Sequence, residues 1–136
     1  MNYELRAYIG ISRIKNTIDR DSNRLVKKYG LSLAQFAVME ALFHKGDMCV
    51  GEVREVILSS SGTMPVIVRN LKKKSLLLSY KDEEDKRKEM LSLTDKGRDL
   101  ISEVFPENKE IIKGYFENLS KKEIRDFIKL LQKMKV

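Results

Sequence analysis

The sequence has few of the residues that a catalytic, metal-binding or disulfide-bonded protein needs. The single cysteine excludes an internal disulfide. One cysteine and one histidine together are too few ligands for a structural zinc site. No glycine-rich phosphate-binding loop is present, and the paired carboxylates lie in a charged run without signs of a pocket. We therefore expect a protein that is not an enzyme and that holds no metal and no cofactor.

Long apolar runs and prolines are scarce as well. No apolar stretch approaches the roughly 20 residues that span a membrane, and the N-terminus lacks a signal-peptide core, so we expect a cytoplasmic protein without a membrane partner. Only Pro65 and Pro106 interrupt the 136 residues, which predicts a single, largely helical domain. The 27 Lys and Arg against 20 Asp and Glu give a net charge of +7, which favours a polyanionic partner.

The first half of the chain carries helical patterns. Apolar residues recur at helical spacing over positions 3–29, and Gly30 is placed to end that helix. Asp21 and Ser22 break the apolar stripe, either because the helix changes packing partner there or because polar groups line a cavity. A second helix begins after Ser32, with Gln35 at the spacing of a capping box.

This second helix is apolar on nearly all sides as far as Phe43, which predicts a position at the centre of the fold. A short strand or turn at 47–50 and a short helix over 53–57 follow it. A tight run of small residues, 59–62, then leads into a helical pattern over 62–74. Two short helices joined by a tight turn form a helix-turn-helix.

The helix at 62–74 has two chemically different faces. The face predicted to pack inward consists of Met64, Ile67, Val68 and Leu71. The outward face suits a major groove, because Arg and Asn bind base edges and Thr and Val contact a thymine methyl; its residues are Thr63, Val66, Arg69, Asn70 and Lys73. Ser60 and Ser61, with the free amides of the helix start, are placed to hold a phosphate. The alternative is an ordinary surface helix.

A charged hairpin follows that helix. Strand-like segments at 76–80 and 89–93 flank a tip that carries Lys81, Lys86 and Arg87 among four acids. Such a tip is what the wing of a winged helix needs, since a wing follows the DNA backbone or enters a minor groove. Asp85 is placed to hold Arg87. A solvated charged loop is the alternative.

These motifs resemble the MarR family of winged-helix transcriptional regulators over nearly the whole chain. The family's wing pattern matches here at Asp85, Lys86, Arg87, Leu91, Leu93, Thr94 and Gly97. The residues that lead into the recognition helix, 60–63, and the spacing of the central helix are similar too. Two positions depart from the family: Ser75 stands where glycine is common, and Ser79 and Tyr80 stand where arginine is frequent.

The two ends of the chain form amphipathic helices. Thr94 is a plausible N-cap of a long helix that Pro106 should kink or interrupt near Phe105, and Ser120 with Glu123 forms a capping box for the last one. A compact winged helix is too small to cover these helices, so we expect them to join a second copy rather than fold back on their own chain. The resemblance implies the same homodimer.

The predicted fold is therefore mainly α with a small β-hairpin wing, a winged helix-turn-helix with N- and C-terminal dimerisation helices. The single domain 1–136 divides into a DNA-binding lobe, 32–94, and a dimerisation lobe formed by 1–30 and 95–136. The predicted function is that of a homodimeric, sequence-specific repressor on a pseudo-palindromic operator in double-stranded DNA, released by a phenolic or similar small ligand.

Several alternatives stay open. Tyr8, Phe36 and His44 are candidates for a ligand pocket, although a histidine at a helix C-terminus also interacts well with the helix dipole. Cys49 is either a small buried residue or the thiol of a redox-sensing repressor. A winged-helix interaction module that binds protein, or DNA without sequence preference, is the remaining alternative.

Overall fold

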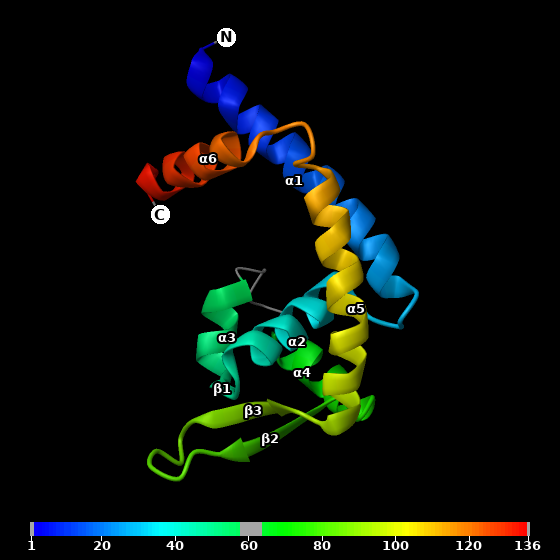
Figure 1. Cartoon of the computed structure of the whole chain (residues 1–136). Coiled ribbons are helices and arrows are strands. Elements are labelled where there is room, and N and C mark those ends of the chain that lie inside the picture. The colour runs from blue at the N-terminus through cyan, green and yellow to red at the C-terminus, as the bar shows by residue number, and fades with distance from the viewer. Residues whose placement is uncertain (1, 58–63, 136) are drawn as a thin grey trace.

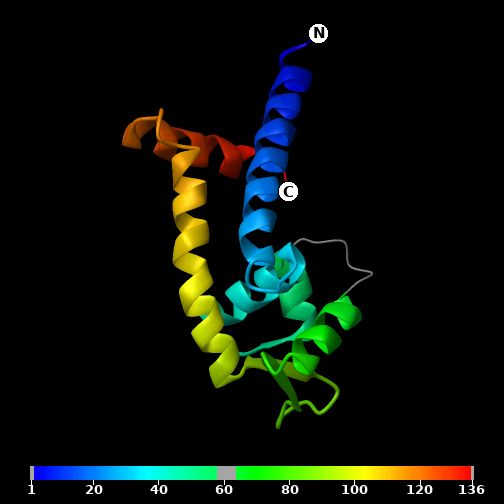
Figure 2. The same cartoon turned by 90° about the vertical axis from the view of Figure 1, so that its right-hand side faces the viewer.

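The computed structural model describes residues 2–57 and 64–135 (Figure 1). The elements follow in the order α1 (Tyr3–Lys27), α2 (Leu33–Lys45), β1 (Met48–Cys49), α3 (Val50–Ile57), α4 (Met64–Lys73), β2 (Leu77–Lys81), β3 (Glu89–Leu93), α5 (Asp95–Gly114) and α6 (Lys121–Lys133). Helices α2 to α4 and the sheet form a compact lobe. Helices α1 and α5 rise from it side by side, and α6 lies across the far part of α1 (Figures 1 and 2).

Local capping explains where the helices begin. The Ser32 hydroxyl accepts from the Gln35 amide at 3.1 Å, and the Gln35 side chain accepts from the Ser32 amide at 3.0 Å, which is the predicted capping box. Ser120 and Glu123 form the same pair before α6. Thr94 caps α5 by accepting from the Gly97 amide at 2.9 Å. All three predicted caps are confirmed.

The sheet is antiparallel with strand order β1-β3-β2. β2 and β3 form the predicted hairpin, with Leu77 opposite Leu93 and Lys81 opposite Glu89, one residue later in β2 than the sequence predicted. The short segment after α2, left open as strand or turn, is a strand whose Met48 pairs with Leu91. The wing is thereby joined to the end of α2 as well as to α4.

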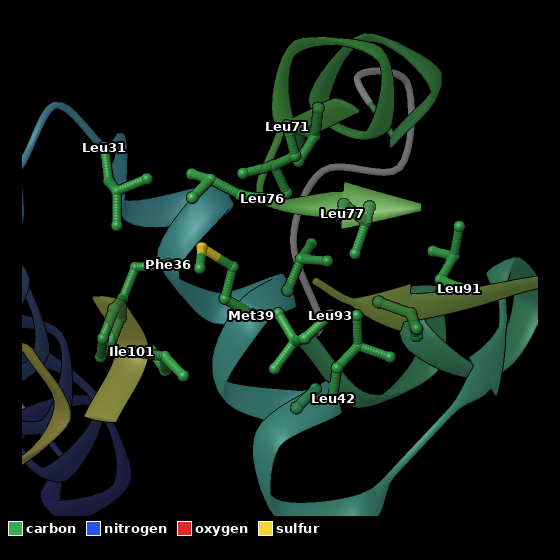
Figure 3. Close-up of a cluster of buried hydrophobic side chains, with 14 of the residues drawn as sticks. Leu31, Phe36, Met39, Leu42, Leu71, Leu76, Leu77, Leu91, Leu93 and Ile101 are labelled. Atoms are coloured by element: carbon green, nitrogen blue, oxygen red, sulfur yellow. The ribbon is translucent and has the colours of Figure 1, made fainter. Parts of the chain in front are cut away.

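The core forms around α2, as its apolar sequence predicted. Phe36, Met39 and Leu42 are buried, and they meet side chains from α4, both wing strands and α5 in one cluster (Figure 3). The predicted inward residues of α4, which are Met64, Ile67, Val68 and Leu71, are all buried. Burying a large apolar side chain stabilises a fold by about 1.5–3 kcal/mol, so this cluster fixes the angle of α4 against α2.

Of the two outcomes predicted for Pro106, a kink or an interruption, the interruption does not occur. Pro106 does not interrupt α5, which runs without a break from Asp95 to Gly114. A proline has no amide hydrogen, so the backbone carbonyl one turn earlier in α5 lacks its helical hydrogen bond. The side chain of Pro106 is exposed, so water can hydrate that carbonyl. In the part of the chain that the structure describes, no helix is long and apolar enough to cross a membrane.

The polar break in α1 lies where this helix changes partner. Before it, α1 is mostly exposed, whereas Leu25 and Val26 after it belong to the core. Ser22 is buried, and the Asp21 carboxylate accepts a hydrogen bond from the Tyr115 hydroxyl at the end of α5. The structure therefore favours the first interpretation, a change of packing partner, over a polar cavity.

Candidate nucleic-acid interface

The outward face of α4 forms an exposed surface of mixed chemistry. Val66 is 43% exposed, Arg69 and Lys73 are exposed, and Asn70 is half-buried. The buried face of the same helix holds them in place. Ser60, Ser61 and Thr63, the other predicted DNA contacts at this end, lie outside the described residues. The structure thus brings four of the predicted residues onto one helix face.

The end of α4 requires a left-handed backbone at position 75, where the sequence has serine instead of the glycine that the resemblance predicts. The Ser75 amide donates to the Lys72 carbonyl at 2.9 Å, and the Leu76 amide donates to the Leu71 carbonyl at 3.0 Å. This pair of bonds is a Schellman motif, which needs a left-handed residue, and Ser75 has φ of 62°. Gly30 ends α1 in the same motif with φ of 77°. Ser75 keeps the geometry at a conformational cost that a glycine avoids.

The wing tip presents basic side chains, one of which is held in a fixed position. The Arg87 guanidinium donates to both oxygens of Asp85, at 3.0 and 3.2 Å, which confirms that Asp85 holds Arg87. This contact holds the pKa of the Asp85 carboxyl below its usual range, so the carboxylate stays charged. The Arg87 side chain remains 91% exposed, and with Lys81 and Lys86 it lines a hollow of about 420 Å³ on the wing.

Tyr80 attaches the wing to the body of the protein, which the sequence alone did not predict. Its hydroxyl donates to Asp47 Oδ2 at 2.6 Å, and this bond to a carboxylate raises the pKa of Tyr80. Tyr80 pairs with Met90, which pairs in turn with Cys49, so the tyrosine reaches from β2 across β3 toward the start of β1. A tyrosine in place of arginine therefore contacts protein here.

Cys49 is the last residue of β1 and directly precedes α3. It is half-buried, and its amide donates to Glu52 Oε1 at 3.1 Å. A hydrogen bond from the Cys49 side chain is the largest cause that lowers the pKa of Glu52.

The predicted ligand-pocket residues do not come together within one chain. Tyr8 is exposed, and Phe36 is buried in the core. His44 packs edge-on against Phe43 and Phe105, with ring centroids 5.3 and 4.5 Å away. It lines a hollow of about 320 Å³ between α2 and α3, together with Glu40, whose pKa burial raises.

A second hollow lies between α1 and α6, with a volume of about 440 Å³. Its lining is apolar and includes Ile11, Ile14, Ile18, Phe127 and Leu131. The apolar stripes of the two helices were visible in the sequence, but the space between them was not. Among the described residues, no group of three or more His, Cys, Asp or Glu side chains is placed to hold a metal ion.

A buried central helix, an exposed polar face on α4 and an antiparallel wing with exposed basic side chains at its tip define a winged helix-turn-helix DNA-binding protein. Comparison with known proteins gives the same result. Residues 22–104 match the family described as transcriptional regulator SarA/Rot. The chain is 31% identical to the HTH-type transcriptional regulator MhqR of Bacillus subtilis (strain 168) over 130 residues, which is 96% of this chain and 90% of MhqR.

Solved structures agree with this fold over nearly the whole chain. BpsR of Bordetella bronchiseptica, whose DNA binding is regulated by 6-hydroxynicotinic acid, superposes with a TM-score of 0.84 at 25% identity and covers 98% of this chain and 96% of its own. The organohalide-sensing regulator RdhR in its 2,4-dichlorophenol-bound form gives a TM-score of 0.82 at 22% identity, over 98% and 79% of the two chains. The chain belongs to the MarR family of winged-helix transcriptional regulators, of the SarA/Rot type. Its relatives are regulators rather than enzymes.

Proposed function

We propose that this regulator is a homodimeric repressor that reads a pseudo-palindromic operator in double-stranded DNA and is released by a phenolic or similar small ligand. The observation that carries the proposal is the exposed face of α4, where Val66, Arg69, Asn70 and Lys73 lie together. Arginine and asparagine make the bidentate base contacts that specify sequence, and a lysine at the helix end contacts phosphate. Ser60, Ser61 and Thr63 complete the proposed DNA contacts at the start of the helix.

The terminal helices support a second copy as the partner, with 1–30 and 95–136 as the dimerisation lobe. None of the residues of α6 is buried, although Phe127, Leu130 and Leu131 are apolar. Tyr8 on α1 is 66% exposed. Exposed apolar surface on this scale marks an interaction site, and a symmetric partner covers both stripes at once. Two copies also provide two α4 helices, one for each half-site of the proposed operator.

The hollow beside His44 is the proposed ligand site. Its apolar walls suit an aromatic ring, and the side chains of His44 and Glu40 suit a ligand hydroxyl group. BpsR and RdhR are described with 6-hydroxynicotinic acid and 2,4-dichlorophenol, which are both small aromatic molecules with an oxygen substituent. A ligand releases DNA only if it binds the dimer geometry that does not fit the operator more tightly than the geometry that does.

Selection of bound sequences from a random duplex pool, followed by titration of single variants, tests the DNA-binding proposal. Arg69→Ala and Asn70→Ala are each expected to relax specificity at defined positions by about 1–3 kcal/mol. Lys86→Ala and Arg87→Ala are expected to weaken binding to all sequences and to flatten the salt dependence. Lys109→Ala, on the exposed side of α5, is a charge-matched control. Equal binding to selected and random duplexes would refute the repressor and favour an interaction module.

Release and assembly are tested separately. Phenols and oxidants are added to the preformed complex of the wild type and of Cys49→Ser. Release by phenols from both proteins supports the ligand mechanism, whereas release by oxidant that is lost in Cys49→Ser supports a thiol sensor. Sedimentation of the DNA-free protein reports assembly, and a monomer at micromolar concentration would contradict the dimer.

A further inference from the structure

Three consecutive lysines lie at the C-terminal end of α4, Lys72 and Lys73 in its last turn and Lys74 directly after it, and they lie in three different environments. Successive side chains on a helix are about 100° apart, so neighbours in sequence face different surroundings. Lys72 Nζ lies 3.0 Å from Glu89 Oε1 on the wing strand β3. Lys74 Nζ donates to the Gly30 carbonyl and, at 3.2 Å, to Gln35 Oε1. Lys73 is exposed and makes no hydrogen bond or ion pair with any residue that the structure describes.

Lys74 connects the end of α4 to the point where α1 ends and α2 begins. Gly30 is the left-handed residue that terminates α1, and the Gln35 oxygen also completes the cap of α2 by accepting from the Ser32 amide. Both acceptors belong to well-fixed local motifs. An ammonium held by both of them restrains the end of α4 relative to α1 and α2.

The opposite side of the same junction is attached to α5. Lys96 Nζ donates to the Lys74 carbonyl at 3.0 Å, and the Thr94 hydroxyl donates to the Ser75 carbonyl at 2.6 Å. The C-terminal end of α4 is therefore held between the two helices that rise toward the terminal lobe. The Lys72–Glu89 pair restrains the preceding turn of α4 against the wing.

We propose that Lys72 and Lys74 are positioning residues that fix the recognition helix between the wing and the terminal helices, and that Lys73 alone of the three contacts DNA phosphate. The proposal rests on the proposed reading of DNA by α4. Base contacts demand placement within about 0.5 Å, whereas phosphate contacts tolerate small displacements. Loss of a positioning lysine therefore lowers affinity for the operator more than affinity for random DNA.

Three variants, Lys72→Met, Lys73→Met and Lys74→Met, test this division. Each removes one positive charge, so their long-range electrostatic effects match. Affinities for the selected duplex and a random duplex are measured over a series of KCl concentrations. Lys73→Met is expected to weaken both in proportion and to reduce the magnitude of the log–log salt slope by about 0.9. Lys72→Met and Lys74→Met are expected to keep the slope and to lower operator affinity alone, by about two- to fivefold.

Further variants separate positioning from simple loss of stability. Lys74→Arg, which keeps the charge and donors, is expected to retain discrimination. Gln35→Glu keeps the capping box and gives Lys74 a charged acceptor, so discrimination should be retained. In the Lys74→Met background the same substitution leaves a buried carboxylate without its ammonium partner and should lower the temperature of thermal unfolding. Thermal unfolding of each variant shows that the titrations are made on folded protein.

The outcomes distinguish this proposal from the function on which it rests. A slope reduced by about 0.9 in Lys74→Met, with discrimination unchanged, would make Lys74 a phosphate contact and overturn the assignment. Unchanged slope and unchanged discrimination would overturn it as well. A wild type that binds selected and random duplexes equally would refute the proposed repressor itself.

Discussion

Gly97 lies where the first turn of α5 passes the backbone that leads into β2, and the approach leaves no room for a side chain. A Cβ added to Gly97 would lie 2.2 Å from the Leu76 carbonyl oxygen and 3.1 Å from its carbon. Carbon and oxygen atoms in favourable contact are about 3.3–3.6 Å apart, so one backbone must move by about 1 Å. The same carbonyl accepts from the Thr94 amide at 3.2 Å, so the displacement also strains the cap of α5.

The size of the effect of Gly97→Ala follows from opposing contributions. Alanine is favoured over glycine inside a helix by about 1 kcal/mol. Overpacking costs about 1–3 kcal/mol, and the upper end applies because the neighbour is backbone rather than a flexible side chain. Weakening of the Thr94–Leu76 hydrogen bond adds about 1 kcal/mol. We expect a net loss of about 2–3 kcal/mol in the free energy of unfolding.

Urea unfolding at a fixed protein concentration measures this loss, since the transition of the proposed dimer depends on concentration. Gly114→Ala is the matched control, because it lies on the same helix and a Cβ there meets nothing within 4 Å. The control is expected to be neutral or up to about 1 kcal/mol more stable. A Gly97→Ala protein as stable as the wild type would refute the argument from close approach.

Three further predictions follow from single side chains. Ser75→Gly is expected to stabilise the protein by about 0.5–1 kcal/mol in the same urea assay, because glycine relieves the left-handed strain at some cost in unfolded-state entropy; a loss of stability would contradict this. Tyr80→Phe removes the bond to Asp47, so amide hydrogen exchange in the wing, 82–88, should accelerate while the core stays protected, and unchanged exchange would argue against the attachment. Burial raises the pKa of Glu40, so its contribution to stability is present at low pH and is lost as pH rises through the folded value. The free energy of unfolding of Glu40→Gln minus that of the wild type should therefore be larger at about pH 7 than at about pH 4. The same difference at both pH values would contradict this.

Features that depend on neighbouring residues were readily predicted from the sequence. The caps at Ser32, Thr94 and Ser120 and the inward face of α4 depend on spacings of three and four residues, which the chain itself specifies. The continuity of α5 through Pro106 was not predictable, because the effect of an internal proline depends on whether the freed carbonyl reaches water. That exposure is a property of the folded molecule.

The roles of the lysines were beyond the sequence for a related reason. The sequence indicated that basic residues gather at the end of α4. However, the hydrogen-bond partner of Lys72 is 17 residues away in the sequence, and that of Lys74 is 44 residues away. Their contacts exist only because the sheet brings β3 beside α4 and the core brings the α1–α2 turn to its end. Tyr80 is a similar case, because its partner Asp47 is 33 residues away, so a departure from the family pattern became a contact within the protein.

The junction around Leu76 determines how a signal in the terminal helices could reach DNA in the proposed dimer. Gly97 contacts the backbone there without a gap, and Thr94 and Lys96 bond to the same short segment. Relative motion of α4 and α5 would break these contacts, so the two helices should move as one body. α5 has 20 residues and is therefore about 30 Å long. A rotation of about 5° at its far end would shift α4 by about 2.5 Å, several times the tolerance of about 0.5 Å for base contacts. A ligand in the proposed site beside His44 would therefore release DNA by tilting α5, because the His44 ring packs 4.5 Å from the ring of Phe105 on α5, and such a tilt changes how two copies meet.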